Sequence, residues 1–291
     1  MEYVSGIKKK DVMGIRDIVN GQLDGQEVKI RGAIHALRDM SEITFVILRT
    51  YEGLIQCVFD ENKMLHFNPK DLREGMTVEA IGSVSQETRA PGGFEILLLD
   101  VRILSEPAPE TVMPIPINKW KLNTSLETKL SLRPISLRNL RERAIFKIQE
   151  GIVRGFRDYM FSQHFTEIRT PKIVAGNAEG GANVFKLEYF GKKAFLAQSP
   201  QFYKQTMVGV YDRVFEVAPV FRAEKHNTSR HLNEYISLDF EMGYIDGFED
   251  IMEMEAAMLS YTMDLIAREY AKEIQLLEIT LPKASNIPTV R

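Results

Sequence analysis

The sequence has 291 residues, of which 44% are apolar and 26% are charged, and its formal net charge is −3. This length suits about two domains of a globular protein. The charge excludes a global basic field for nucleic acid, although a local basic patch would be sufficient to bind RNA. Because Cys57 is the only cysteine, we expect no internal disulfide, an inert buried thiol and a cytoplasmic location. The N-terminal MEYVSGIKKK has no apolar core, and no run of about 18 apolar residues occurs, which predicts neither a signal peptide nor a membrane span.

Residues 26–104 show an apolar period near two, which predicts strands. The predicted strands are EVKIRGAI, ITFVILRT, LIQCVF, MTVEAIGSV and FEILLLDVRIL. Between the third and fourth strands, NPKDLREG predicts a short helix with Asn68 as its N-cap and Pro69 at its first position. Three strands, a helix and two strands is the order of a five-stranded OB barrel, whose strand 2–3 face commonly binds oligonucleotides. Another small antiparallel barrel is the alternative.

An OB domain reads unpaired bases with aromatic platforms and nearby hydrogen-bonding groups. Phe45 on the second strand and Gln56 on the third can share one face, which makes them candidate base contacts. Core packing or an ordinary solvated position is the competing interpretation for each. The loop RAPGG (89–93) lies between the last two strands, where OB folds often contact their ligand.

The segment SEPAPETVMPIPIN (105–118) contains four prolines and no clear period, so we interpret it as a semi-rigid linker. Beyond it, helical spacing predicts a helix that ends near His164 and carries an apolar stripe. The stripe consists of Ile145, Ile148, Ile152, Phe156 and Tyr159. FTEIRTPKIV then predicts a strand interrupted at Pro171, which cannot donate to a ladder and so belongs at an edge or an interface.

The rest of the chain alternates short strands with helices. The predicted strands are VFKLEYF, KAFLAQ, RVFEVAPVFRAE and YISLDFEMGYI. SPQFYKQTMV predicts a helix with Ser199 as N-cap and Pro200 at its first position, and a long helix is predicted over 248–273. Strands in succession with helices to the side predict an antiparallel sheet in an α+β fold.

The stretch FRAEKHNTSRHLNEYISLDFE (221–241) concentrates opposed charges between two apolar runs. Arg222 and Glu224 are two residues apart and so point to one face of a strand, as do Asp239 and Glu241. Burying such charges costs several kcal/mol each unless they are partnered, which favours a site for a charged ligand. The alternative is a solvent-facing hairpin with ion pairs. A metal pair of His226 and His231 is less favoured than two neutral surface histidines.

This stretch closely resembles motif 2 of the class II aminoacyl-tRNA synthetases, and FTEIRTPKI resembles their motif 1. EGGANVF, FLAQSPQFYKQ and DRVFEVAPVFRAE resemble the aspartyl/asparaginyl branch, and RPISLR resembles its hinge. The resemblance implies an α+β protein with an N-terminal five-stranded OB barrel and part of a class II antiparallel-sheet catalytic domain. It places an anticodon-binding domain at 1–104, a linker and hinge at 105–135, and an incomplete catalytic domain at 136–291.

The resemblance also implies roles for individual residues. Arg222 would be the catalytic residue, binding the α-phosphate of ATP and the substrate carboxylate. The implied ATP-binding residues are Arg222, Ala223, Glu224, Arg230, His231 and Leu232. The implied aspartate-binding residues are Glu179 in the EGG loop, Gln201, Lys204, Arg222 and Asp239, which would take the α-ammonium.

The implied activity is that of an aspartate–tRNA ligase, which uses ATP and Mg²⁺ to form aspartyl-adenylate and then charges tRNA(Asp). Lys204 favours aspartate over asparagine because a lysine in the pocket suits a side-chain carboxylate. The resemblance further implies a homodimer through the helix 141–163 and the strand that ends at Pro171. An asparaginyl-tRNA synthetase, a tRNA-binding paralogue without catalysis, and an asparagine-synthesising paralogue are the alternatives.

The sequence departs from the family pattern after Glu241. The glycine-rich motif 3 with its γ-phosphate arginine is absent, and only Gly243 and Gly247 follow. The metal-binding carboxylates that precede motif 3 should therefore also lie beyond Arg291. We expect a fragment of a longer enzyme, rather than a truncated paralogue, that does not complete aminoacylation alone.

Two positions bear on which tRNA is charged. His35 stands where strict relatives tend to carry tryptophan, and Pro91 stands where they tend to carry lysine. Both are expected near the third anticodon base, and a proline cannot donate the hydrogen bond that a lysine can. We therefore expect a relaxed enzyme that charges tRNA(Asn) as well as tRNA(Asp), with ordinary loop drift as the alternative.

Overall fold

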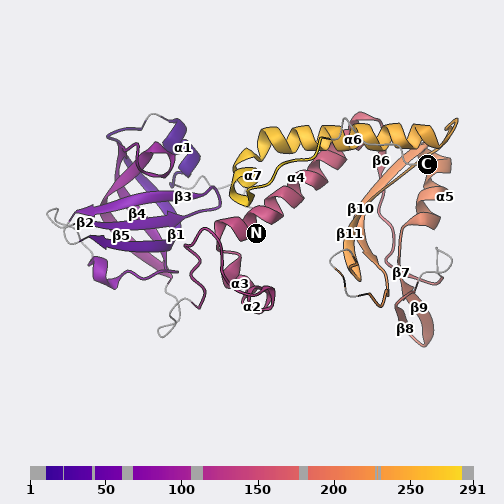
Figure 1. Ribbon diagram of the computed structural model, residues 1–291, viewed down its shortest axis with the longest axis horizontal. Helices are drawn as coiled ribbons and strands as arrows, with labels where there is room; N and C mark the ends of the chain where they lie inside the picture. The colour runs from indigo at the N-terminus through magenta and orange to yellow at the C-terminus, as the bar shows by residue number, and fades with distance from the viewer. Residues whose placement is uncertain are drawn as a thin grey trace, which may run out of the picture. The chain divides into compact units, whose positions relative to one another are not determined.

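The computed structural model describes residues 11–21, 23–40, 43–60, 68–105, 114–176, 183–226, 228 and 231–283. The chain forms two compact units, Met1–Glu142 and Arg143–Arg291, and each is described by itself (Figure 1). Within the described ranges, no helix is long and apolar enough to cross a membrane.

The first unit contains a closed five-stranded barrel. Its strands are β1 (Glu27–Met40), β2 (Ile43–Arg49), β3 (Leu54–Asp60), β4 (Thr77–Gln86) and β5 (Phe94–Ser105). They close in the order β1-β2-β3-β5-β4, with β3 parallel to β5 and the other neighbours antiparallel. The strand alternation fills the barrel with aliphatic side chains, and Ile18 of α1 (Ile15–Asn20) also packs there. The predicted OB order is confirmed.

The expected helix before β4 is a single 3-10 turn, η1 (Pro69–Asp71). Asn68 caps it as predicted, because its side chain accepts a hydrogen bond from the Lys70 N–H. A second such turn, η2 (Pro91–Gly93), joins β4 to β5. Gly82 allows a close backbone approach in the barrel, because a Cβ atom there would lie 2.2 Å from the Leu97 carbonyl oxygen.

The chain leaves the barrel through a short helical segment, α2 (Leu126–Ser131) and α3 (Arg133–Ser136). Buried Asn139 fixes this segment, since its amide nitrogen donates to the carbonyl oxygens of Ile117 (2.9 Å) and Lys119 (2.6 Å). Its side-chain oxygen accepts the Arg141 N–H at 2.9 Å. The same side chain therefore holds the linker and starts α4 (Leu140–Ser162).

The second unit has two small sheets. The first runs β11-β10-β6 and consists of β6 (Thr166–Glu167), β10 (Arg213–Phe221) and β11 (Glu234–Met242). The second runs β7-β9-β8 and consists of β7 (Ile173–Val174), β8 (Lys186–Tyr189) and β9 (Lys192–Leu196). The predicted strand around Pro171 is thus broken, as expected, and its two halves join different sheets. β6 pairs with β10 in parallel, whereas β10 and β11 are antiparallel.

Two long helices, α4 and α6 (Phe248–Glu269), lie side by side (Figure 1). Gly155 of α4 allows the close approach, because a Cβ atom there would lie 2.9 Å from the Thr262 side chain. Of the predicted stripe on α4, Phe156 is buried, while Ile148 and Ile152 pack on Leu265, Ile266 and Tyr270. Ile145 instead remains 52% exposed.

Two predicted boundaries were wrong by small amounts. The long helix expected over 248–273 ends at Glu269, and α7 (Ala271–Leu277) follows it after Tyr270. α5 (Gln201–Tyr211) begins one residue later than expected, so that Pro200, and not Ser199, occupies the N-cap position. The Ser199 hydroxyl still accepts the Gln201 N–H at 3.1 Å, and therefore supplies the capping hydrogen bond.

Candidate active site

The alternation of β10 and β11 gives their sheet one apolar and one charged face. Phe215 and Phe240 lie opposite each other and pack with α4 and α6 side chains, including Phe156 and Met258. Glu216 and Asp239, one position away in the register, lie opposite each other on the other face. Of the predicted row of charges, Asp239 and Glu241 therefore share one half-buried face of the sheet, but the residue opposite Asp239 is Glu216 and not Arg222 or Glu224.

Lys204 of α5 is the centre of a cluster on this charged face. Its Nζ atom lies 2.9 Å from Asp239 Oδ1 and 3.2 Å from Glu241 Oε2. Burial alone would lower the pKa of Lys204, but the two carboxylates outweigh it and raise the pKa above its ordinary value. Ser237 completes the cluster with a 2.6 Å hydrogen bond to Asp239 Oδ2. The structure thus brings Lys204 and Asp239 together as expected.

Arg222, Ala223 and Glu224 lie just past the end of β10, which stops at Phe221. The expectation that the strand itself carries Arg222 and Glu224 is corrected to this extent. The backbone is nevertheless held, because the Arg222 N–H donates to Asn233 O (3.0 Å) and the Ala223 N–H donates to Asn183 O (2.9 Å). The Arg222 guanidinium carbon lies 5.9 Å from the centre of the Tyr235 ring, which orients its planar fork.

The connection after Arg222 carries the other predicted nucleotide contacts. His231 Nε2 lies 3.7 Å from Glu224 Oε2, and His231 Nδ1 lies 2.7 Å from the Thr228 hydroxyl. Leu232 is 60% exposed. The rings of His226 and His231 lie 5.1 Å apart, but the described residues contain no cluster of three or more potential metal ligands. Arg230 and Glu179 lie outside the described residues.

Glu216 is a site residue that the sequence reasoning missed. Its side chain is almost fully buried, and its carboxylate accepts hydrogen bonds from the Thr170 N–H, the Thr170 hydroxyl and Lys172 Nζ, each at 2.8 Å. These partners flank Pro171, so a buried ion pair fastens the predicted interface segment to the charged sheet face. The signal in the sequence was RVFEVAP, in which a single acidic residue stands within a mostly apolar strand and therefore needs a partner.

A second missed feature is a cavity of about 280 Å³ beside the start of α5. Its lining includes Gly176, Gln198, Ser199 and Phe202. Gln198 is buried, and its Nε2 atom donates to Asn183 O at 3.2 Å. Gln201 begins α5 one turn before Lys204, so the helix presents both to one side. A mostly apolar pocket with a few polar groups such as Gln198 and Ser199 can hold a small molecule.

The barrel in the first unit has a candidate nucleic-acid face. Phe45 lies opposite Val58, and Gln56 lies opposite Ile47 in the β2–β3 pairing, so Phe45 and Gln56 point to the same outer face. Gln56 Nε2 donates to Glu95 Oε2 at 2.8 Å, which places a carboxylate beside the amide. A half-buried aromatic ring next to an amide and a carboxylate offers stacking and hydrogen bonding to an unpaired base.

His35 and Pro91 lie in different environments from each other. Pro91 is exposed in η2, where a ligand can reach it. His35 is only 4% exposed, and its Nδ1 lies 3.5 Å from Arg49 Nη1, which donates to Arg138 O at 3.1 Å. His35 stands at the register irregularity between Ile34 and Ala36, and its ring is buried beside Arg49. The expected approach of His35 to an anticodon base is therefore corrected.

A closed five-stranded barrel of the oligonucleotide-binding kind is followed along the chain by an α+β unit with a charged sheet face. The family described as tRNA synthetases class II (D, K and N) matches residues 125–289, and an OB-fold nucleic acid binding domain matches residues 28–104. The chain belongs to the class II tRNA synthetases of this D, K and N group.

Similar proteins point to one branch of this family. The chain is 46% identical over 270 residues to an aspartate–tRNA(Asp/Asn) ligase of Deinococcus radiodurans, covering 92% of this chain and 60% of the relative. It is 45% identical to the ligase of the same name in Thermus thermophilus, covering 89% and 59%. An asparaginyl-tRNA synthetase of Pyrococcus horikoshii with bound asparaginyl-adenylate superposes with a TM-score of 0.80 at 30% identity, covering 88% and 58%. The chain thus spans about 60% of the length of its relatives.

Proposed function

We propose that this chain is the anticodon-binding domain and part of the catalytic domain of an aspartate–tRNA ligase. The observation that carries the proposal is the cluster of Lys204, Asp239 and Glu241 on the charged face of β10 and β11. Arg222 follows directly after the end of β10. The names of the two ligases from Deinococcus and Thermus support the same branch. A cytoplasmic location belongs to the proposal, since buried Cys57 is the chain's single, free cysteine.

The first proposed step forms aspartyl-adenylate. A carboxylate oxygen of aspartate attacks the α-phosphorus of ATP, a new P–O bond forms, and pyrophosphate leaves. The fork of Arg222 contacts an α-phosphate oxygen and the attacking carboxylate, so that it stabilises charge that grows in the transition state. The tRNA 3′-terminal hydroxyl then attacks the activated carbonyl and AMP leaves.

The charge of the Lys204 cluster fits a substrate with an α-ammonium group. One lysine faces two carboxylates, so the cluster carries an excess negative charge that a bound ammonium would balance. Asp239 would accept a hydrogen bond from the α-ammonium group of the substrate, as the resemblance implies. Because Lys204 is already paired with two carboxylates, asparagine is the second candidate substrate, and pyrophosphate exchange with asparagine in place of aspartate separates the two.

Mg²⁺ and ATP enter the proposal through the family. The described residues offer no cluster of three or more carboxylate or imidazole ligands. We therefore assign no Mg²⁺ ligand in this chain and derive no step through the ion. The nucleotide would lie between Arg222 and the Glu224–His231 pair, with Ala223 and Leu232 beside the base.

We predict that the longest reading frame containing this chain charges both tRNA(Asp) and tRNA(Asn) with aspartate. Exposed Pro91 offers no side-chain donor to a base, and losing one such contact removes about 1–3 kcal/mol of discrimination. Aminoacylation of the two purified transcripts should proceed at rates within about 100-fold of each other. A rate thousands of times lower on tRNA(Asn) would show a strict enzyme. An absence of aspartate-dependent pyrophosphate exchange would favour the tRNA-binding paralogue without catalysis.

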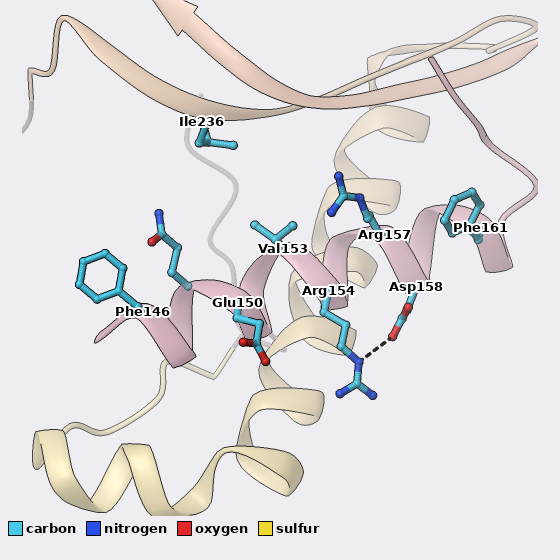
Figure 2. Close-up of a pocket in the computed structure, with 9 residues that line it drawn as sticks. Phe146, Glu150, Val153, Arg154, Arg157, Asp158, Phe161 and Ile236 are labelled. Carbon is cyan, nitrogen blue, oxygen red and sulfur yellow. Dashed lines mark ion pairs between the residues drawn. The ribbon is translucent and has the colours of Figure 1, made fainter. Parts of the chain in front are cut away.

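We also propose a homodimer through α4, which matches the motif 1 helix. A depression of about 580 Å³ runs along this helix and is lined by Phe146, Val153, Phe161 and Ile236 among others. Figure 2 shows Val153 and Arg157 directed from α4 toward Ile236, while Arg154 pairs with Asp158. Phe161 and Ile236 are 53% and 50% exposed, which leaves an apolar surface for a second copy.

We predict that Val153→Arg converts the dimer to a monomer, because two copies of the new charge would meet across a two-fold interface. Sedimentation velocity on the 291-residue chain measures the change. Val210→Arg on α5, the same substitution at an exposed valine outside the depression, should leave the dimer intact. A strict monomer of the parent chain at high concentration would contradict the proposal.

A further inference from the structure

The hairpin of β8 and β9 ends in a tip whose exposure and backbone are both unusual. Tyr189 pairs with Lys192, so Phe190 and Gly191 form a two-residue loop. Both loop residues have positive φ, 49° and 75°, the pattern of a type I′ turn. Asparagine and glycine suit this turn, whereas a bulky residue with positive φ is an outlier that normally has a reason.

Packing does not supply that reason. Phe190 is 89% exposed, and its ring contacts only the neighbouring Tyr189 ring among the aromatic pairs of the described residues, edge to face at 4.7 Å. Tyr189 is itself 47% exposed. The chain thus holds an aromatic pair in solvent at the cost of a strained turn, which is a feature expected of a contact surface.

The charges around the tip indicate what it contacts. Lys186, Lys192 and Lys193 are all exposed, and no ion pair joins them to another described residue. Glu188 is the single acidic residue between Lys186 and Lys193. The hairpin is therefore basic in a chain whose net charge is −3. Exposed aromatic rings beside lysines are the elements with which proteins bind unpaired nucleotides, since rings stack on bases and ammonium groups contact phosphates.

We propose that this tip, Tyr189–Lys193 with Lys186, is a docking surface for unpaired nucleotides of RNA. The inference rests on the proposed function, in which the RNA is the tRNA to be charged. β9 leads from the tip to Gln198 and α5, and eight extended residues span roughly 25 Å. A nucleotide stacked on Phe190 would therefore lie on the 5′ side of the reacting 3′-terminal nucleotide. It would guide the RNA toward the Lys204 cluster.

The turn chemistry allows a test that separates binding from folding. Phe190→Asn places the favoured Asn-Gly pair in the type I′ turn, so the hairpin should be at least as stable while the platform is lost. Phe190→Trp keeps the platform. Tyr244 provides the matched control, because it is 94% exposed and has φ 55° but is followed by Asp246, Glu249 and Asp250.

The experiment measures fluorescence anisotropy of a labelled tRNA(Asp) transcript titrated with the 291-residue chain. Phe190→Asn should weaken binding about 5- to 100-fold, while Phe190→Trp and Tyr244→Ala should stay within about twofold of the parent. Replacing Lys192 and Lys193 by alanine should reduce the slope of log affinity against log salt by about 1.4. The melting temperature of Phe190→Asn should equal or exceed that of the parent chain.

Three outcomes would overturn the proposal. If the parent binds tRNA and Phe190→Asn binds equally well, the hairpin is not an RNA contact, while the proposed ligase function stands. If the parent does not bind tRNA, both proposals fall. If Phe190→Asn loses self-association in sedimentation and keeps its RNA affinity, the tip contacts protein instead.

Discussion

Replacing Arg222 by alanine should lower aspartate-dependent ATP–pyrophosphate exchange by at least about 10²–10³-fold, because one donor to developing transition-state charge is lost. The loss should fall on kcat more than on the KM for aspartate, since this interaction strengthens only as charge moves onto the phosphate. Arg222→Lys should show an intermediate rate, because an ammonium keeps the charge but cannot form two parallel hydrogen bonds. The assay uses the longest reading frame that contains the chain.

The fold should survive this substitution. Arg222 lies beyond the end of β10 and its backbone hydrogen bond to Asn233 does not involve the side chain. Arg268→Ala is the matched control, since Arg268 pairs with Glu269 on the exposed side of α6 and should leave exchange within about twofold of the parent. Near-normal exchange by Arg222→Ala would show that the resemblance to motif 2 has misassigned the catalytic arginine.

The sequence predicted the helices and strands well where a periodic apolar pattern was bounded by a residue that caps or interrupts secondary structure. The barrel strands, the cap at Asn68 and the interruption at Pro171 are of this kind. It predicted that Asp239 and Glu241 share one face of β11, because a period of two assigns faces without knowledge of the partner strand. Lys204 meets Asp239 across two elements, and only the resemblance suggested that they share a pocket.

What the sequence could not predict depends on a local irregularity or on a distant partner. His35 is buried at an irregularity in the register of β1 against β2, and nothing in GAIHALRD marks that irregularity. Glu216 receives its hydrogen bonds from residues more than forty positions away. A single acidic residue in an apolar strand indicates that a partner exists, but it does not identify which residue that is.

Replacing Glu216 by alanine should destabilise the second unit by about 3–5 kcal/mol, because Lys172 would be left as a mostly buried charge without its carboxylate. The Thr170 N–H and hydroxyl would lose their acceptor as well. Urea unfolding of the 291-residue chain measures the loss as a lower midpoint at an unchanged slope. Arg268→Ala is the control, because it breaks only the exposed Arg268–Glu269 pair, and it should cost no more than about 1 kcal/mol.

The double variant Glu216→Leu/Lys172→Met should recover the part of that stability that the unpaired Lys172 costs, because a buried ion pair can often be replaced by apolar side chains of similar size, while the Thr170 donors still lack their acceptor. Its catalytic rate then separates two roles of Glu216. If the ion pair only supports the fold, stability and pyrophosphate exchange should recover together. If it also positions the sheet face, exchange should stay low in the stable double variant, since Glu216 lies opposite Asp239 in the register. A loss below about 1 kcal/mol in Glu216→Ala would instead show that the network bears little of the unit's stability.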